Sequence, residues 1–201
     1  MISISQWRIT SLVAIVLAVM SAVSFAWLGL GEEAIRAMVR GTARSSVLLF
    51  VLAFSASSLH VLFNTNWSRW LRQNRRYIGV SFALSHFVHL LFLILLMVYF
   101  PEDMFARLHI VEIILAGLTY VFILVMAITS FEGPRQWLGE RYWHILHTTG
   151  MYLIWLIFIE TYSFATWHNM VYLPLVVILL MAMGLRIAKG IKIKREPLNT
   201  A

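Results

Sequence analysis

The sequence predicts an all-α integral membrane protein, a single six-helix bundle that covers residues 1–201. The chain is 61% hydrophobic and only 12% charged, and its mean hydropathy is +0.81. A soluble domain of this size does not need that much apolar surface. The apolar residues also gather into six runs, each about long enough to cross a bilayer as a helix, whereas alternating barrel-type strands are absent from the sequence.

The six expected spans follow one another through short loops. The first run is not a signal-peptide core, because it is full length and continues into glycines and two glutamates without a cleavage pattern. We expect an external loop at 31–45 that can form a small amphipathic helix, an inner interfacial loop at 64–76, and a turn at 130–141 broken by Gly133, Pro134 and Gly139. The expected spans are residues 9–30, 46–63, 77–100, 110–131, 142–165 and 170–185, all approximate.

The basic residues predict the orientation of the chain. Of the sixteen lysines and arginines, twelve lie before the first span, between spans two and three, between spans four and five, or after span six. Only four lie on the other side, at Arg36, Arg40, Arg44 and Arg107. The positive-inside rule therefore places both termini in the cytoplasm. We expect a multi-pass protein of the bacterial inner membrane.

Composition also limits the chemistry and the partners. The chain has no cysteine, which excludes disulfides, iron–sulfur clusters, cysteine–zinc sites and a catalytic thiol. The net charge of +7 is explained by topology and by contact with anionic membrane lipid, so no nucleic-acid partner is expected. Docking of an acidic partner or a flavin phosphate on the basic inner face stays open as an alternative.

Histidines inside the expected spans are the main candidates for function. His109 and His168 fall at the outer interface, but five others fall within spans two, three and five. Two pairs are spaced three residues apart and therefore share a helical face: His86 with His89, and His144 with His147. Ionisable residues in a membrane span suggest function, and a haem iron in a bundle takes neutral imidazoles from facing helices.

The depth of each histidine can be estimated from the expected inner ends of the spans, at 1.5 Å per residue. His86 lies about 14 Å deep, His89 about 18 Å, His147 about 8 Å, His144 about 3 Å and His60 about 6 Å. By depth, His86 or His60 matches His147 better than His89 does. Gly150, one turn beyond His147, would either let a porphyrin approach the backbone or serve close helix packing.

Other uses of histidine fit the sequence less well. A proton relay would need buried carboxylates, and Glu112 and Glu160 both fall toward the outer ends of their spans. A hydrolase would need a nucleophile beside a base, and no serine elbow is present. A methionine as a haem ligand stays open.

Two stretches, "RRYIGVSFALSHFVHLLF" at 75–92 and "ITSFEGPRQWLGERYWHILHTTGMYLIW" at 128–155, resemble a known family. The chain is similar to the ferric-reductase-like transmembrane domain, nearest to the haem-binding membrane subunit of the periplasmic methionine sulfoxide reductase system (the MsrQ/YedZ family). The resemblance covers spans two to six. It is carried by Arg75, Arg76, Gly79, His89, Thr129, Ser130, Leu138, Gly139, Leu146 and His147.

The resemblance implies haem b held between spans three and five, with His89 and His147 as axial ligands to the iron. Family members often hold a second haem, through a span-five histidine thirteen residues after the first. That position is Glu160 here, so one haem is expected and a second stays open, with His60, His86 or His144 as substitute ligands.

The function implied is that of a membrane b-type cytochrome, the electron-transfer subunit of a transmembrane oxidoreductase. No glycine-rich dinucleotide motif follows a strand, so the donor is expected to be a quinol or a separate cytoplasmic flavin reductase. The acceptor would be a periplasmic reductase subunit, a ferric chelate or oxygen. The alternative is a non-redox transporter or assembly factor in which the histidines are structural.

Overall fold

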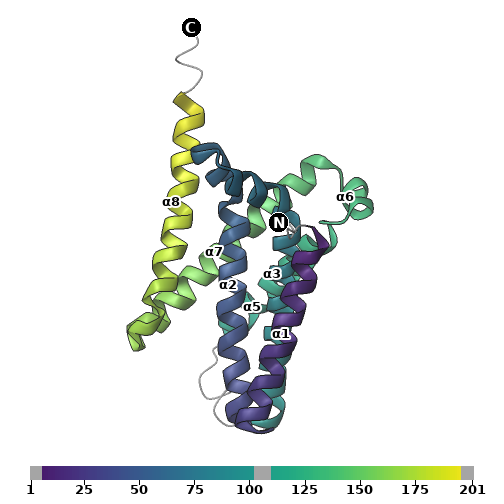
Figure 1. The fold of residues 1–201 in the computed structure, drawn as a ribbon, viewed down its shortest axis with the longest axis vertical. Coiled ribbons are helices and arrows are strands. Elements are labelled where there is room, and N and C mark those ends of the chain that lie inside the picture. The colour runs from purple at the N-terminus through teal and green to yellow at the C-terminus, as the bar shows by residue number, and fades with distance from the viewer. Residues whose placement is uncertain (1–5, 102–109, 196–201) are drawn as a thin grey trace.

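The computed structural model describes residues 6–101 and 110–195, with only the backbone described at 110–112. Every element in these ranges is a helix, as the composition predicted (Figure 1). The elements are α1 (Trp7–Leu28), α2 (Glu32–Phe63), α3 (Asn66–Tyr99), α5 (Ile110–Ile128), α6 (Glu132–Leu138), α7 (Glu140–His168), the 3₁₀ turn η1 (Met170–Tyr172) and α8 (Leu173–Arg195).

Several of these helices have the length and composition of membrane spans, which indicates a multi-pass membrane protein. Four qualify alone: α1, α2, α3 and the Met170–Arg195 segment that joins η1 to α8. A fifth is added if Ile113–Ile128 and α6, which are bent by 107° relative to each other, form one broken span. The expected fifth span, α7, is long enough to cross a membrane but carries more polar residues. By length and composition the described helices therefore include four or five candidate spans rather than six.

The segment 31–45 is not a separate external loop with its own surface helix; it is the first part of α2. The helix begins at Glu32 and runs unbroken for 32 residues. Two glutamates in the first turn complement the positive end of the helix dipole, and Glu32 pairs with Arg36 at 2.6 Å across one turn. These local interactions, with no proline in the segment, favour helix over loop.

The expected interfacial loop at 64–76 is also mostly helical. Asn64 adopts a left-handed conformation that ends α2, and the Thr65 side chain accepts a hydrogen bond from the Ser68 amide at 3.2 Å, which caps α3. Similarly, Gly133 and Pro134 do not break a helix but lie in the first turn of α6, where proline is tolerated. Only Gly139, with φ of +78°, separates α6 from α7.

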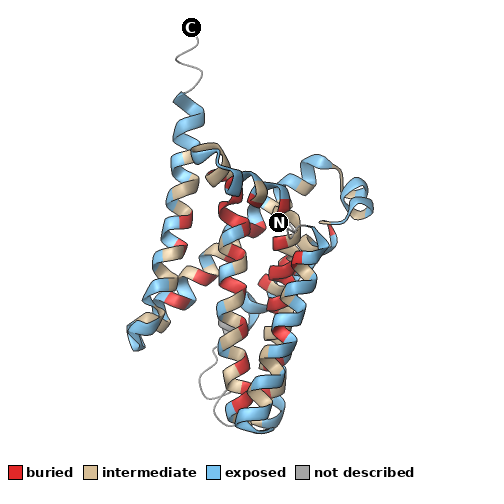
Figure 2. Ribbon diagram, in the orientation of Figure 1, coloured by how far each residue is buried: buried red, intermediate tan, exposed pale blue. Residues whose placement is uncertain are grey.

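The core lies between α2, α3, α7 and α8. Phe50 of α2 contacts the rings of Phe82 and Phe158, which belong to α3 and α7. Figure 2 shows the buried residues on the facing sides of these helices, while α6 and the C-terminal end of α8 are mostly exposed. The N-terminal end of α1 and the C-terminal end of α8 point toward the same end of the bundle (Figure 1).

Candidate functional site

A cavity of about 280 Å³ lies between α2, α3, α5 and α7, at the end of the bundle where α6 is found. Its size is near the lower limit of ligand pockets. The cavity combines an apolar interior with a charged rim. Its apolar wall includes Phe50, Phe82, Ile123, Met126, Met151 and Ile154, and its polar rim includes Arg75, Arg76, Ser130, Glu132, Arg135 and His147.

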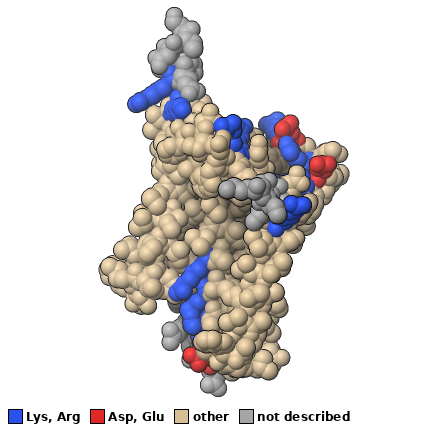
Figure 3. Space-filling view, viewed as in Figure 1, with Lys and Arg blue, Asp and Glu red and all other residues tan. Residues whose placement is uncertain are grey.

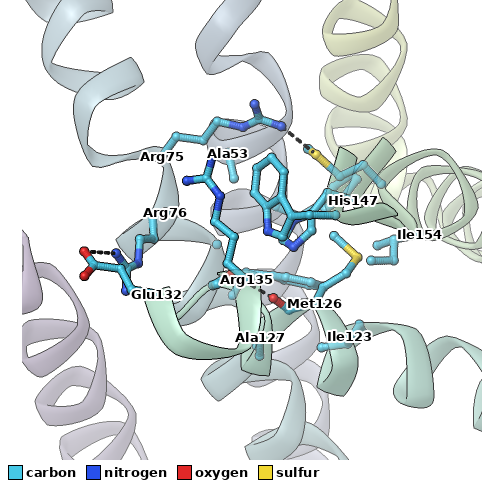
Figure 4. Close-up of a pocket in the computed structure, with 17 residues that line it drawn as sticks. Ala53, Arg75, Arg76, Ile123, Met126, Ala127, Glu132, Arg135, His147 and Ile154 are labelled. Atoms are coloured by element: carbon cyan, nitrogen blue, oxygen red, sulfur yellow. Dashed lines mark hydrogen bonds and ion pairs between the residues drawn. The ribbon is translucent and has the colours of Figure 1, made fainter. Parts of the chain in front are cut away.

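Three arginines make this rim strongly positive. Arg75 donates hydrogen bonds to Ser57 Oγ at 3.3 Å and to Met151 Sδ at 2.9 Å. Arg76 lies 3.9 Å from Glu132, the one carboxylate among the described residues that line the cavity. The Arg135 guanidinium lies 4.6 Å from the centre of the Trp143 ring. Figure 4 shows Arg75, Arg135 and His147 converging on the cavity from three helices. Such a rim suits an anionic group.

His147 is positioned by the end of α5. Its Nε2 lies 3.1 Å from Thr129 Oγ1, and its ring is 4.3 Å from that of Trp143. The Thr129 hydroxyl also bonds to the Val125 carbonyl at 2.7 Å. Because a carbonyl can only accept, the hydroxyl proton goes there and His147 Nε2–H donates to Oγ1. The free lone pair of the ring then lies on Nδ1.

Two glycines near His147 have different roles. A Cβ added at Gly79, which lines the cavity, would meet no atom within 4 Å, so this part of the wall is bare backbone facing open space. A Cβ added at Gly150 would collide with Met126 Sδ and lie 3.3 Å from Phe122. Of the two alternatives for Gly150, close packing of α7 on α5 is therefore the one the structure supports, and Gly79 is the glycine that faces the cavity.

A second histidine site lies deeper in the bundle, around His86. Its ring centre is 4.9 Å from Tyr120, 5.4 Å from His89 and 5.6 Å from Phe158. His86 is buried, and its Nδ1 has no hydrogen-bond partner among the described residues. A buried polar atom without a partner is uncommon in a folded protein and marks a place where a ligand or water can bind.

His89 faces α2 rather than the cavity. Its Nδ1 lies 3.1 Å from the Val39 carbonyl and 3.2 Å from Thr42 Oγ1. Since a carbonyl accepts, Nδ1 carries the proton and Nε2 the lone pair. Metal-binding histidines commonly have this arrangement, in which one nitrogen is tied to a carbonyl and the other is free to coordinate.

The structure does not bring His89 and His147 together. His147 shares the cavity with Gly79, and His89 lies ten residues further along α3, about 15 Å along the helix axis. Phe82 separates the two sites, since it lines the cavity and also lies 5.5 Å from the His86 ring. The two histidines therefore belong to different levels of the bundle.

The remaining predicted residues lie apart from both sites. His60 is half-buried near the end of α2, and its Nδ1 has no partner within the described ranges. His144, His168 and Glu160 are exposed. His109 and the side chain of Glu112 fall outside the described residues. Within the part of the chain that is described, no three histidine, aspartate or glutamate side chains form a cluster that could hold a metal ion.

No protein-family model, curated protein or solved structure matches the chain. Fold and site together indicate a helical multi-pass membrane protein, whose described residues form an arginine-rimmed cavity and a deeper histidine cluster. Tyr120, Phe158 and Thr42 were not among the residues predicted from sequence. A tyrosine in the middle of an apolar run, opposite a histidine pair, is the signal that could have suggested Tyr120.

Proposed function

We propose that this chain is a membrane b-type cytochrome that binds haem b in the arginine-rimmed cavity, with His147 as an axial ligand. The observation that carries the proposal is the chemistry of the cavity. It offers an imidazole, three guanidinium groups and an apolar interior, which match the iron, the two propionates and the macrocycle of haem. The bare backbone at Gly79 leaves room on the α3 side.

Each part of the chain has a defined task in this proposal. His147 supplies the nitrogen ligand, and Thr129 fixes the orientation of its ring. Arg75, Arg76 and Arg135 would bind the haem carboxylates, and the apolar wall would exclude water. Bound haem would supply one-electron redox chemistry, while the chain sets its ligation and burial. A methionine sulfur would supply a second ligand: Met126 and Met151 line the cavity, and Met151 Sδ also accepts a hydrogen bond from Arg75.

A second haem, held by the deeper cluster around His86 and His89, would be the second site for electrons. His89 Nε2 is free to coordinate, and the buried Nδ1 of His86 lacks a partner among the described atoms. Phe82 lies between the two levels and contacts both. Electrons would pass from a quinol or a separate cytoplasmic flavin reductase at the cavity, through this cluster, to a periplasmic acceptor such as a reductase subunit.

In this proposal the chain crosses a bacterial inner membrane six times, with both termini in the cytoplasm. Its fifth crossing is α7, whose 29 residues span about 44 Å as a helix, more than a bilayer core needs. The polar residues that lower the hydropathy of α7 form two groups: those around His147, which a cofactor-binding span requires, and those at 160–168 toward its other end.

The alternative is a non-redox transporter or assembly factor with structural histidines. One observation favours it: His147 and His86 both have close neighbours, Thr129 and Trp143 for one and Tyr120 and Phe158 for the other. Packed contacts of this kind can hold a histidine in place without a cofactor.

A difference spectrum separates the two functions. The full chain is expressed with haem supplied, purified in detergent, and measured after dithionite reduction against the oxidised sample. The cytochrome predicts a b-type spectrum and a pyridine haemochrome of non-covalent haem. A folded, colourless protein would exclude it and leave the non-redox alternative.

A further inference from the structure

Three arginines form a charged ridge on α2, at the end of the bundle away from the cavity. Arg36, Arg40 and Arg44 are spaced one turn apart, so they are neighbours on one side of the helix. We call these three residues the arginine ridge. Figure 3 shows basic side chains as a stripe in a hollow in the lower half of the molecule. Leu48 and Leu52 continue the same spacing and are 47% and 36% exposed.

The ridge lies beside an apolar span. Gly41 of α2 faces Met20 of α1, since an added Cβ would lie 3.0 Å from the Met20 sulfur. The two helices are antiparallel, so the ridge runs opposite the second half of α1, which has no charged residue from Ile9 to Leu28. Exposed Val19 and Val23 lie on this part of α1. Positive charge at this level is costly unless an anion or water accompanies it.

Among the described residues, no ion pair neutralises the charge of Arg40 or Arg44, whereas Arg36 is paired. Arg36 pairs with Glu32 at 2.6 Å. The Arg44 guanidinium lies 5.5 Å from the centre of the Tyr172 ring, which orients the group without neutralising it. Arg40 is exposed, and no ion pair joins it to another described residue. Arg40 and Arg44 are exposed and therefore present their guanidinium groups to the hollow.

We propose that the arginine ridge binds the phosphate of an anionic phospholipid, with an acyl chain along Leu48 and Leu52. The planar guanidinium fork matches the oxygens of a phosphate. The exposed leucines that follow the arginines supply an apolar wall, which a lipid needs and a small anion does not. Along one side of α2 the surface changes from charged to apolar, just as a phospholipid changes from its charged headgroup to its apolar acyl chains.

This inference does not depend on haem binding. Phe50 and Ala53 of α2 line the cavity and are buried, whereas Leu48 and Leu52 are exposed, so the lipid would lie on a different face of α2 from the haem. Failure of the lipid site would leave the cavity proposal untouched, and the reverse also holds.

The test is a lipid titration of the detergent-solubilised full chain, read by native mass spectrometry. Phosphatidylglycerol is compared with zwitterionic phosphatidylcholine. The double variant Arg40→Gln with Arg44→Gln is expected to bind phosphatidylglycerol about tenfold more weakly, while phosphatidylcholine binding changes little. The matched control, Lys194→Gln with Arg195→Gln, removes two positive charges from the far end of α8 and should leave the ridge-bound lipid in place.

Two further arms identify the source of the phosphate. Leu48→Ser with Leu52→Ser should weaken phosphatidylglycerol binding if a whole lipid is held, and competing inorganic phosphate should not displace the lipid. Ready displacement by phosphate, with no effect of the leucine changes, would overturn the proposal in favour of a small-anion site. An equal loss in the α8 control would overturn it in favour of general charge attraction.

A milder pair of changes serves as the control for misfolding. Arg40→Lys with Arg44→Lys keeps the charge but removes the guanidinium fork, and should weaken binding by a smaller factor than the glutamine pair. Lipid binding that is unchanged in both pairs would contradict the proposal.

Discussion

His89 and His147 each have one ring nitrogen engaged by a residue of a neighbouring segment. Thr129 engages Nε2 of His147, and the Val39 carbonyl engages Nδ1 of His89. The free nitrogen therefore differs between the two rings. The sequence predicted these two residues from spacing and resemblance, but it could not predict which nitrogen is free, because that depends on contacts between helices distant in sequence.

The arginines of the cavity give the first prediction at the residue scale. Arg76→Gln or Arg135→Gln should reduce haem occupancy of the purified protein several-fold, because each change removes a charged donor for a carboxylate. Arg141→Gln, an exposed arginine on the first turn of α7 that does not line the cavity, is the matched control. The haem-to-protein absorbance ratio measures the effect. Full occupancy in both cavity variants would mean that the arginines do not bind the cofactor.

Glu160 gives the second prediction. Its exposed side chain lies thirteen residues beyond His147, about 20 Å along α7. Glu160→Ala should therefore leave the haem at His147 unchanged in amount and spectrum. Fewer than two bis-histidine haems per chain are expected, as counted by haem stoichiometry and low-temperature EPR. Two fully occupied bis-histidine haems, with His60, His86 and His144 individually dispensable, would contradict the assignment of ligands along α7.

At the scale of elements, the contact of α7 with α5 depends on Gly150. Gly150→Ala should lower the free energy of unfolding by about 1–3 kcal/mol, because the new methyl group would collide with Met126 and press on Phe122. Gly184→Ala on α8, where an added Cβ meets nothing within 4 Å, is the matched control. Thermal unfolding in detergent measures both variants. An equal effect of the two changes would show that α7 and α5 do not pack this closely.

The elements also show what sequence could and could not predict. Hydropathy predicted an all-helical chain and the apolar part of each long helix. It did not predict that α2 and α3 extend well beyond their apolar runs, since the extensions are polar. Those extensions are stabilised by local interactions such as the Glu32–Arg36 pair and the Thr65 cap, which hydropathy does not measure. The sequence also did not predict that the rim residues form one site, because they come from separate helices.

At the scale of the whole molecule, the topology can be tested cleanly because the chain has no cysteine. Single cysteines at Gln136 and Lys194 should be labelled only from the cytoplasmic side, and one at Trp167 only from the outside. Trp167 is exposed at the end of α7, just before the η1–α8 segment, and Lys194 is exposed near the other end of that segment. Membrane-impermeant maleimide on intact cells can therefore distinguish them. Labelling of positions 136 and 194 from opposite sides would contradict six crossings with both termini inside.

The central claim, haem b at the arginine-rimmed cavity, is tested most directly by removing its one histidine. His147→Ala is compared with His168→Ala, a change of an exposed histidine at the end of the same helix. Both variants are expressed with haem supplied, and their reduced-minus-oxidised spectra are recorded at equal protein concentration. The account predicts loss of the cavity haem signal in His147→Ala and full retention in His168→Ala. An unchanged spectrum in a folded His147→Ala protein would contradict it.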